Sequence, residues 1–211
     1  MTLHTVLTRV TPMILIAALT GCATNAQTGS VAGGAAGCAL GLLLDKGNKH
    51  QLAKCAEGAA PLALAGYYLG RQRDLQLARD AAMQISNGQP GQVAVQLRTA
   101  NLMVPQENRA SVNNAASIES LDTMLVSVPQ PQVKRMDPQA TRSLARVGKY
   151  LADSQGNARV TVSAQSQQDY DFIVSSVRGG YGRPLAPQKV VYQYRPLTRG
   201  TQALVEVTPV A

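Results

Sequence analysis

Cysteine and histidine are the side chains of this chain with the most reactive groups near neutral pH, and they are few. Cys38 and Cys55 lie on either side of the polar stretch 45–50, at similar distances from its centre. In an antiparallel hairpin that symmetry brings the two thiols to similar heights, which favours a disulfide in an oxidising compartment. Two small buried thiols are the alternative. A metal site of Cys38, His50 and Cys55 is rejected, because the neighbourhood offers no fourth ligand.

The remaining residues do not form a catalytic pattern. His50 is the one histidine after residue 21, and it precedes the whole C-terminal half, so a Ser-His-Asp or Cys-His arrangement cannot form there. The carboxylates of that half are scattered, and Asp169 and Asp171 are typical of a helix N-terminus. The glycine-rich segments lack the Gly-Lys-Ser/Thr ending and the preceding strand of a phosphate-binding loop. We therefore expect a protein that is not an enzyme and that holds no cofactor or metal.

The first 21 residues have the pattern of a secretion signal. Arg9 is followed by the apolar stretch 12–19, which is shorter than the ~20 residues that a membrane span needs. Residues 19–22, Leu-Thr-Gly-Cys, resemble the lipobox of bacterial lipoproteins, in which the cysteine is acylated and becomes the first residue. The resemblance implies that Cys22 carries lipid, palmitate included, and Ala23 after it implies sorting to the outer membrane. An ordinary signal peptide with a plain thiol at Cys22 is the alternative.

Two apolar arms with regularly spaced glycines follow a short polar tether, residues 22–28. The glycines of the stripe are Gly29, Gly33, Gly37, Gly41, Gly58, Gly66 and Gly70. On a helix this spacing places glycines along one face, where two backbones can approach closely. Because each Gly costs about 1 kcal/mol relative to Ala in a helix, we interpret the stripe as a packing surface. We expect a helical hairpin that self-associates.

The hairpin is short for a membrane span. Each arm has about 16 regular residues, or ~24 Å at the helical rise. It would span a tilted or thinned bilayer, lie in or on the membrane, or join a bundle. Pro61 is expected to kink the second arm or to mark the start of its regular part. From Arg71 the arm becomes amphipathic and is predicted to leave the membrane zone as a stalk that ends before the breaker cluster 86–91.

The pattern beyond the breaker cluster predicts a second, α+β domain. Strands are expected at 93–97, 123–128, 159–163, 189–194 and 203–208. Asp137 is predicted as the N-cap of a helix with Pro138 in its first position, and 169–177 predicts a second, shorter helix. The polar stretch 106–117 is expected to be helical or loose.

The order strand, helix, strand, helix, strand, strand after such a hairpin resembles glycine-zipper lipoproteins with an OmpA-like C-terminal domain. The resemblance is carried by Gly-Tyr-Tyr-Leu-Gly-Arg-Gln at 66–72, by Met-Asp-Pro at 136–138 with its helix, and by the strand residues 160–162 and 204–207. In that family a Gly-His/Tyr-Thr-Asp loop and a helix with Asn-x-x-Leu-Ser-x-x-Arg-Ala bind the peptidoglycan peptide through an Asp and an Arg. Here residues 163–166 read Ser-Ala-Gln-Ser and Arg178 is not a positional match, so no peptidoglycan-binding residue is carried over.

The composition of the chain limits the classes of partner that it is expected to bind. Lys and Arg number 20 against 12 acids, a formal net charge of +8, and loss of residues 1–21 removes only Arg9 and leaves +7. Dispersed positive charge suits anionic neighbours such as lipid headgroups, lipopolysaccharide or cell-wall polymers. Aromatic residues make up 4% of the chain, with no Trp and a single Phe, so there is no stacking platform for nucleic acid.

These observations predict a lipoprotein of the cell envelope, anchored in the outer membrane by lipid and hairpin, with its C-terminal domain in the periplasm. The predicted divisions are a signal peptide (1–21), a lipidated tether (22–28), the hairpin and stalk (29–86), a linker and strand region (87–119) and the divergent OmpA-like domain (120–211). A structural role with self-association is the first hypothesis. Assembly within an envelope-spanning secretion or conjugation machine is the second, and weak peptidoglycan binding is the third.

Overall fold

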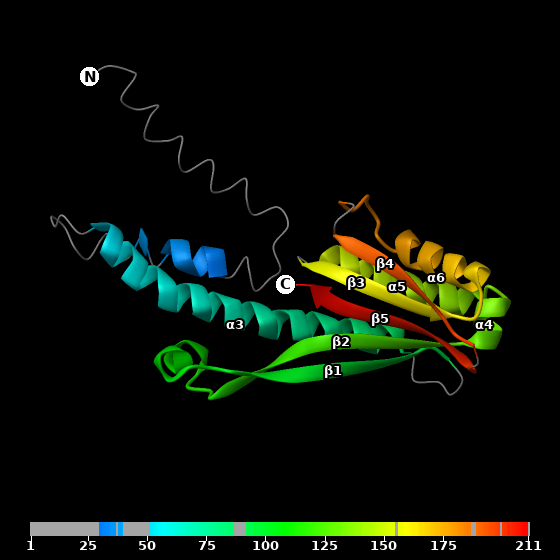
Figure 1. Cartoon of the computed structure of the whole chain (residues 1–211), viewed down its shortest axis with the longest axis horizontal. Coiled ribbons are helices and arrows are strands. Elements are labelled where there is room, and N and C mark those ends of the chain that lie inside the picture. Colours follow the sequence, from blue (N-terminus) through cyan, green and yellow to red (C-terminus); the bar gives the residue numbers. More distant parts are fainter. Residues whose placement is uncertain are drawn as a thin grey trace, which may run out of the picture.

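The computed structural model describes residues 30–36, 38–39, 51–86, 92–154, 156–186, 189–198 and 200–210. Within them the chain forms helices and a single five-stranded sheet of mixed direction, ordered β1-β2-β5-β3-β4. The α+β class expected from the sequence is therefore confirmed. Figure 1 shows the principal helices on one face of this sheet.

One long helix, α3 (Gln51–Ile85), runs from the N-terminal hairpin into the C-terminal half of the molecule. Its 35 residues correspond to about 52 Å at the helical rise. Pro61 lies inside this helix, ten residues after its start, so the expectation that regular structure begins at Pro61 is wrong. The preceding helical residues, 30–36 with 38–39, lie beside its N-terminal part in Figure 1.

The C-terminal half of α3 is a core element rather than a free stalk. Leu75, Ala78 and Ile85 recur at helical spacing and are buried in the main hydrophobic cluster. The helix packs on β2, α5 and β1. The apolar periodicity of this stretch is thus satisfied by the protein's own sheet.

The sheet begins with a long antiparallel pair. β1 (Ala94–Met103) pairs along its whole length with β2 (Ser117–Pro129), and the 3-10 helix η2 (Gln106–Val112) lies between them. The register shifts between Arg98 and Thr99. Residues 87–119 were expected to be a linker and strand region. They include β1, which is an edge strand of the same sheet as the strands beyond residue 120.

The other three strands complete the sheet. β5 (Gln202–Val210) is antiparallel both to β2 and to β3 (Asn157–Ala164), while β4 (Val190–Pro196) lies parallel to β3 at the second edge. The residues of β3 and β5 that face the helices are fully buried, as Val160 and Val205 illustrate. The parallel pair requires a crossover, and α6 (Gln167–Gly179) provides it.

The helices between the strands begin at local signals in the sequence. The Asp137 carboxylate accepts hydrogen bonds from the backbone N–H groups of Gln139 (2.8 Å) and Ala140 (3.2 Å). This confirms Asp137 as the N-cap of α5 (Pro138–Asp153) with Pro138 in its first turn. A short helix, α4 (Gln130–Lys134), precedes it. Ser166, not Asp169 or Asp171, caps α6.

Helices α5 and α6 touch through glycines. A Cβ placed on Gly148 of α5 would overlap the Val177 carbonyl oxygen and lie 2.9 Å from its carbon. A Cβ on Gly180, which caps α6, would overlap the Ala145 carbonyl oxygen and lie 2.8 Å from the Ala145 Cα. Both neighbours are backbone atoms that cannot rotate away, so this approach requires the absence of a side chain at both positions.

We predict that Gly180→Ala lowers the free energy of unfolding by about 1–3 kcal/mol, because its methyl group would force α5 and α6 apart. Gly179→Ala is the matched control, since a Cβ at Gly179 meets nothing within 4 Å. Urea unfolding followed by circular dichroism compares the two variants. Equal midpoints would show that the helix contact relaxes without cost.

Candidate functional site

The N-terminal hairpin contains most of the residues that the sequence marks as functional. A Cβ on Gly33 would overlap the Leu62 carbonyl oxygen and lie 2.6 Å from the carbonyl carbon. A Cβ on the adjacent Gly34 would make only an ordinary contact, 3.4 Å from the Ala63 Cβ. Gly33 therefore permits close approach between the two arms of one chain.

A disulfide joins the same two arms. Cys38 and Cys55 are bonded across 17 residues, one from each arm. Because both thiols are consumed in this bond, neither is available as a nucleophile or a metal ligand. The cross-link restricts the ways in which the two arms can separate.

The remaining predicted positions of this region divide into two groups. In α3, Gly66 is half-buried and Gly70 is buried. Gly58 belongs to the same helix. The other predicted positions lie outside the described residues: Cys22, Gly29, Gly37, Gly41 and His50.

The adjacent residues Tyr67 and Tyr68 of α3 lie in two different environments. Tyr68 is buried in a small cluster with Val104, Val112 and Ile118, so it contacts protein. Tyr67 accepts a hydrogen bond from Arg71 Nε (3.1 Å), and the Arg71 guanidinium lies 5.3 Å from the centre of its ring. None of the helices in the described part of the chain has the length and apolar character needed to cross a membrane.

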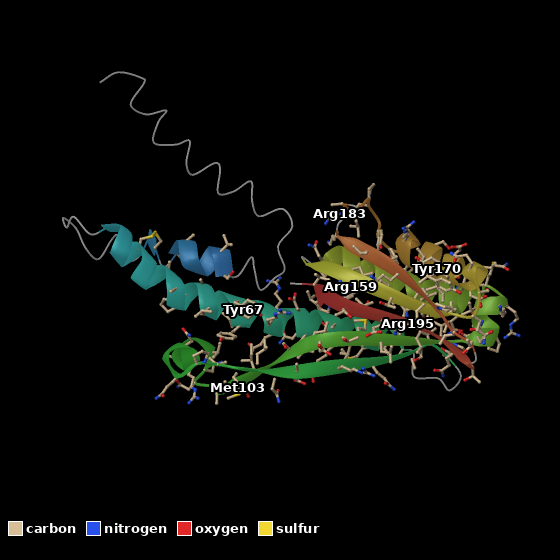
Figure 2. All side chains as sticks on the ribbon, viewed as in Figure 1. Tyr67, Met103, Arg159, Tyr170, Arg183 and Arg195 are labelled. Carbon is tan, nitrogen blue, oxygen red and sulfur yellow. A yellow bond between two sulfur atoms is a disulfide. The ribbon has the colours of Figure 1, made fainter. Side chains whose placement is uncertain are left out.

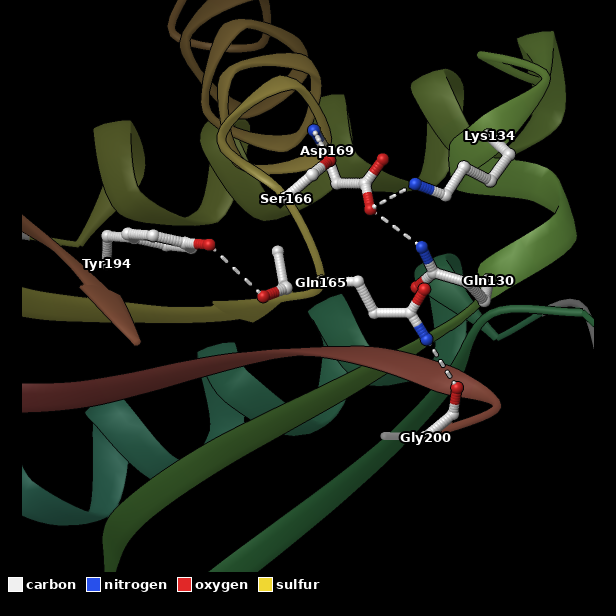
Figure 3. A network of polar contacts seen from close by, with 8 residues as sticks. Gln130, Lys134, Gln165, Ser166, Asp169, Tyr194 and Gly200 are labelled. Atoms are coloured by element: carbon white, nitrogen blue, oxygen red, sulfur yellow. Dashed lines mark hydrogen bonds and ion pairs between the residues drawn. The ribbon is translucent and has the colours of Figure 1, made fainter. Parts of the chain in front are cut away.

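The loop after β3 is where the family resemblance would place a ligand site. Ser163 and Ala164 are buried at the end of the strand. The Gln165 amide donates a hydrogen bond to the Gly200 carbonyl (2.8 Å), and Ser166 Oγ accepts one from the backbone N–H of Asp169 (3.1 Å). Figure 3 shows this network. The loop therefore uses its polar groups to bind other parts of the chain.

Asp169 is the one buried carboxylate within the described residues, and it joins α6 to α4. Its Oδ2 accepts a hydrogen bond from Gln130 Nε2 (2.7 Å) and lies 3.1 Å from Lys134 Nζ (Figure 3). Lys134 is half exposed, so its attraction is partly screened by solvent. With an amide and an ammonium group bound to it, Asp169 acts as a structural anion rather than as a general base.

A cluster of tyrosines beside β4 was not identified from the sequence. Tyr192 and Tyr181 share a hydrogen bond between their hydroxyl groups, and the Arg178 guanidinium lies 5.1 Å from the centre of the Tyr192 ring. Tyr170 packs against Tyr194, with ring centres 5.1 Å apart. Burial, together with the hydrogen bond to Tyr181, raises the pKa of Tyr192. The signal in the sequence was the Tyr-Gln-Tyr alternation of the strand at 192–194.

A groove between α3 and α5 is small for a ligand site. The groove between α3 and α5 has a volume of about 170 Å³, below the ~300 Å³ at which ligand pockets begin. Charged groups of both signs line it, and Lys149 and Asp153 there pair at 2.7 Å. No cluster of three or more metal-binding side chains occurs among the described residues.

We predict that Gly33→Ala destabilises the closed hairpin by about 1–3 kcal/mol, because its methyl group would collide with the Leu62 backbone. The local measurement is the equilibrium of the Cys38–Cys55 disulfide with a glutathione buffer, which shifts toward the dithiol about tenfold for each 1.4 kcal/mol. Gly34→Ala is the control and should leave that equilibrium unchanged. A shift of the same size in both variants would contradict a specific role for Gly33.

Comparison with known proteins found no matching family model, no matching curated protein and no matching solved structure. Function is therefore argued from the residues and their arrangement. The features that bear on it are the cross-linked glycine hairpin, the continuous helix α3 and the polar loop after β3.

Proposed function

We propose that this protein is a lipoprotein anchored in the outer membrane, with a structural, non-catalytic role in the cell envelope. The observation that carries the proposal is the continuity of α3. The helix forms the second arm of the hairpin that follows the proposed lipid anchor at Cys22, and it ends in the core of the sheet at Ile85. A helix with both ends packed in this way holds the α+β domain at a set distance from the membrane.

The hairpin supports the same role. Its Cys38–Cys55 bond suits the oxidising periplasm, where disulfides persist. Because Leu62 of the same chain occupies the space beside Gly33, self-association would use other surfaces of the hairpin. Each arm has an exposed apolar side chain, Val31 at 45% and Leu64 at 41%.

We further propose that β2 to β5 form a divergent OmpA-like domain. The element order supports this, since β2 is followed by α5, β3, α6, β4 and β5, with the short α4 inserted. The loop at 163–166 lacks the carboxylate of the family's ligand site, and Arg178 is engaged with Tyr192. A scaffold that keeps its core and changes its site can take a different partner.

Assembly within a multi-protein envelope machine is the second candidate function, and the tyrosine cluster at the edge strand β4 favours it. The rings of Tyr170 and Tyr194 pack against each other. Aromatic residues are enriched at protein–protein interfaces. Weak peptidoglycan binding is the third candidate, supported by the element order alone.

The lipid anchor is tested with Cys22→Ala. We predict that metabolic palmitate labelling disappears and that the precursor stays at the inner membrane, because the acylated thiol is missing. A Cys38→Ala, Cys55→Ala double variant is the control: it lacks the two other cysteines of the chain and should remain labelled. Label that persists in Cys22→Ala would rule out this anchor.

The cell-wall candidate is tested by co-sedimentation of the detergent-solubilised chain with purified sacculi. We predict no binding at moderate salt, because truncating one partner of a desolvated charge pair costs about 2–5 kcal/mol and here both charges of the family's site are missing. The dispersed positive charge leaves only weak contacts that salt screens. Salt-resistant sedimentation that free peptidoglycan peptide reverses would move this candidate to first place.

A further inference from the structure

The two edges of the sheet differ in how they are protected. Edge strands expose unpaired backbone groups, and proteins commonly blunt them with bulges or charges. β1 carries a register shift between Arg98 and Thr99, which interrupts its edge. β4 pairs with β3 without a shift from Val190 to Pro196, and no other described strand pairs with it. Of the two edges, β4 is therefore the more regular one for the addition of another strand.

The backbone hydrogen bonds show which groups of β4 are free for such pairing. The Lys189 carbonyl accepts from the Ala158 N–H (2.8 Å), and the Leu197 N–H donates to the Ala164 carbonyl (2.8 Å). Since successive residues of a strand alternate in direction, the residues at odd positions of β4 bond to β3. Val190, Tyr192 and Tyr194 therefore direct their N–H and C=O groups toward the open edge.

One side of this edge is apolar and rigid. Tyr192 and Tyr194 are in register with the buried Val160 and Val162, so they lie on the helix-covered face. Their rings are held in place by Arg178 and by Tyr170. Tyr194 is still 37% exposed, so a neighbouring strand could pack its apolar side chains there.

The other side of the edge is positively charged. Arg159 and Arg195 lie on the uncovered face of the sheet and are exposed, and Figure 2 shows both, with Arg183 farther along. Arg195 is on β4 itself, whereas Arg159 is on β3, beside the exposed Val191 of β4. Along the strand direction the two arginines are four positions apart, or about 13 Å. Arg195 has only a distant partner, Glu206 at 3.8 Å. Burial and the charge of Arg183 lower the pKa of Lys189, and the carboxylate of Asp153 opposes this shift.

We propose that β4 is a docking edge for an extended, acidic segment of a partner protein, which adds to the sheet as a sixth strand. Its carboxylates, four residues apart on one face, would pair with Arg159 and Arg195, and its apolar side chains on the other face would contact Tyr192 and Tyr194. The inference goes beyond the proposed function, because strand addition depends neither on lipidation nor on the hairpin.

The test uses the full chain in detergent and a labelled synthetic peptide of the same length as β4, Thr-Glu-Val-Thr-Val-Glu-Val, with fluorescence anisotropy as the readout. We expect salt-dependent binding, and about tenfold or more weaker binding when both Glu residues of the peptide are replaced by Lys. The double variant Arg159→Glu, Arg195→Glu should weaken binding of the Glu peptide by a similar factor. Arg98→Glu, on the opposite edge strand, is the matched control and should change affinity by less than about twofold.

Backbone pairing is tested on the unmodified protein with two N-methylated peptides. N-methylation of one set of alternate residues should abolish binding, whereas methylation of the other set should leave it intact, because only one set faces β4. Loss with both sets, or with neither, would overturn strand addition. Equal binding of the Lys peptide would overturn the charge match. Displacement of the peptide by a soluble peptidoglycan fragment would overturn the proposal and assign the edge to the cell wall. Displacement that accompanies dimerisation of the chain would assign the edge to a second copy of the protein.

Discussion

Close backbone approach at glycine is the constraint on which the helical packing of this protein depends. The contacts of Gly33 with Leu62, of Gly148 with Val177 and of Gly180 with Ala145 leave no room for a side chain. A chain with one Phe and no Trp cannot fill wide gaps between helices with large aromatic groups. It gains dispersion energy instead by bringing helices close together. This holds both for the two arms of the hairpin and for α5 with α6.

Helix α3 connects these two regions mechanically. Its first half contacts the N-terminal arm and carries Cys55, while its second half contributes Leu75, Ala78 and Ile85 to the main core. The hairpin and the sheet therefore do not have separate cores joined by a free stalk. Displacement of the hairpin along the helix axis would be transmitted to β2 and α5, which pack on the helix. This coupling is what the proposed role, a spacer between a membrane anchor and a periplasmic domain, would require.

The polar groups at the end of β3 illustrate how a scaffold can be stable without a ligand. Asp169 is bound by Gln130 and Lys134, and Gln165 is bound by the Gly200 carbonyl. Burying a carboxylate without partners would be costly, so these contacts stabilise the junction of α4 and α6. The proposed docking edge lies elsewhere, along β4, which no other described strand pairs with on its outer side.

Local patterns of the sequence determined the elements of this protein, and tertiary structure decided what they contact. Alternation and helical periodicity located the five strands and helices α5 and α6, and Asp137 with Pro138 located the start of α5, because these signals act within one turn. They did not predict the short helix α4, and the predicted strands 93–97 and 123–128 are about half as long as β1 and β2. The same patterns could not say that the apolar face of 71–85 packs on the sheet, that helix α3 continues through Pro61, or that Ser166 rather than Asp169 caps α6. Periodicity shows which face is apolar but not what covers it. The roles of Gly148, Gly180 and Tyr192 depend on partners distant in the chain, so only the assembled fold defines them.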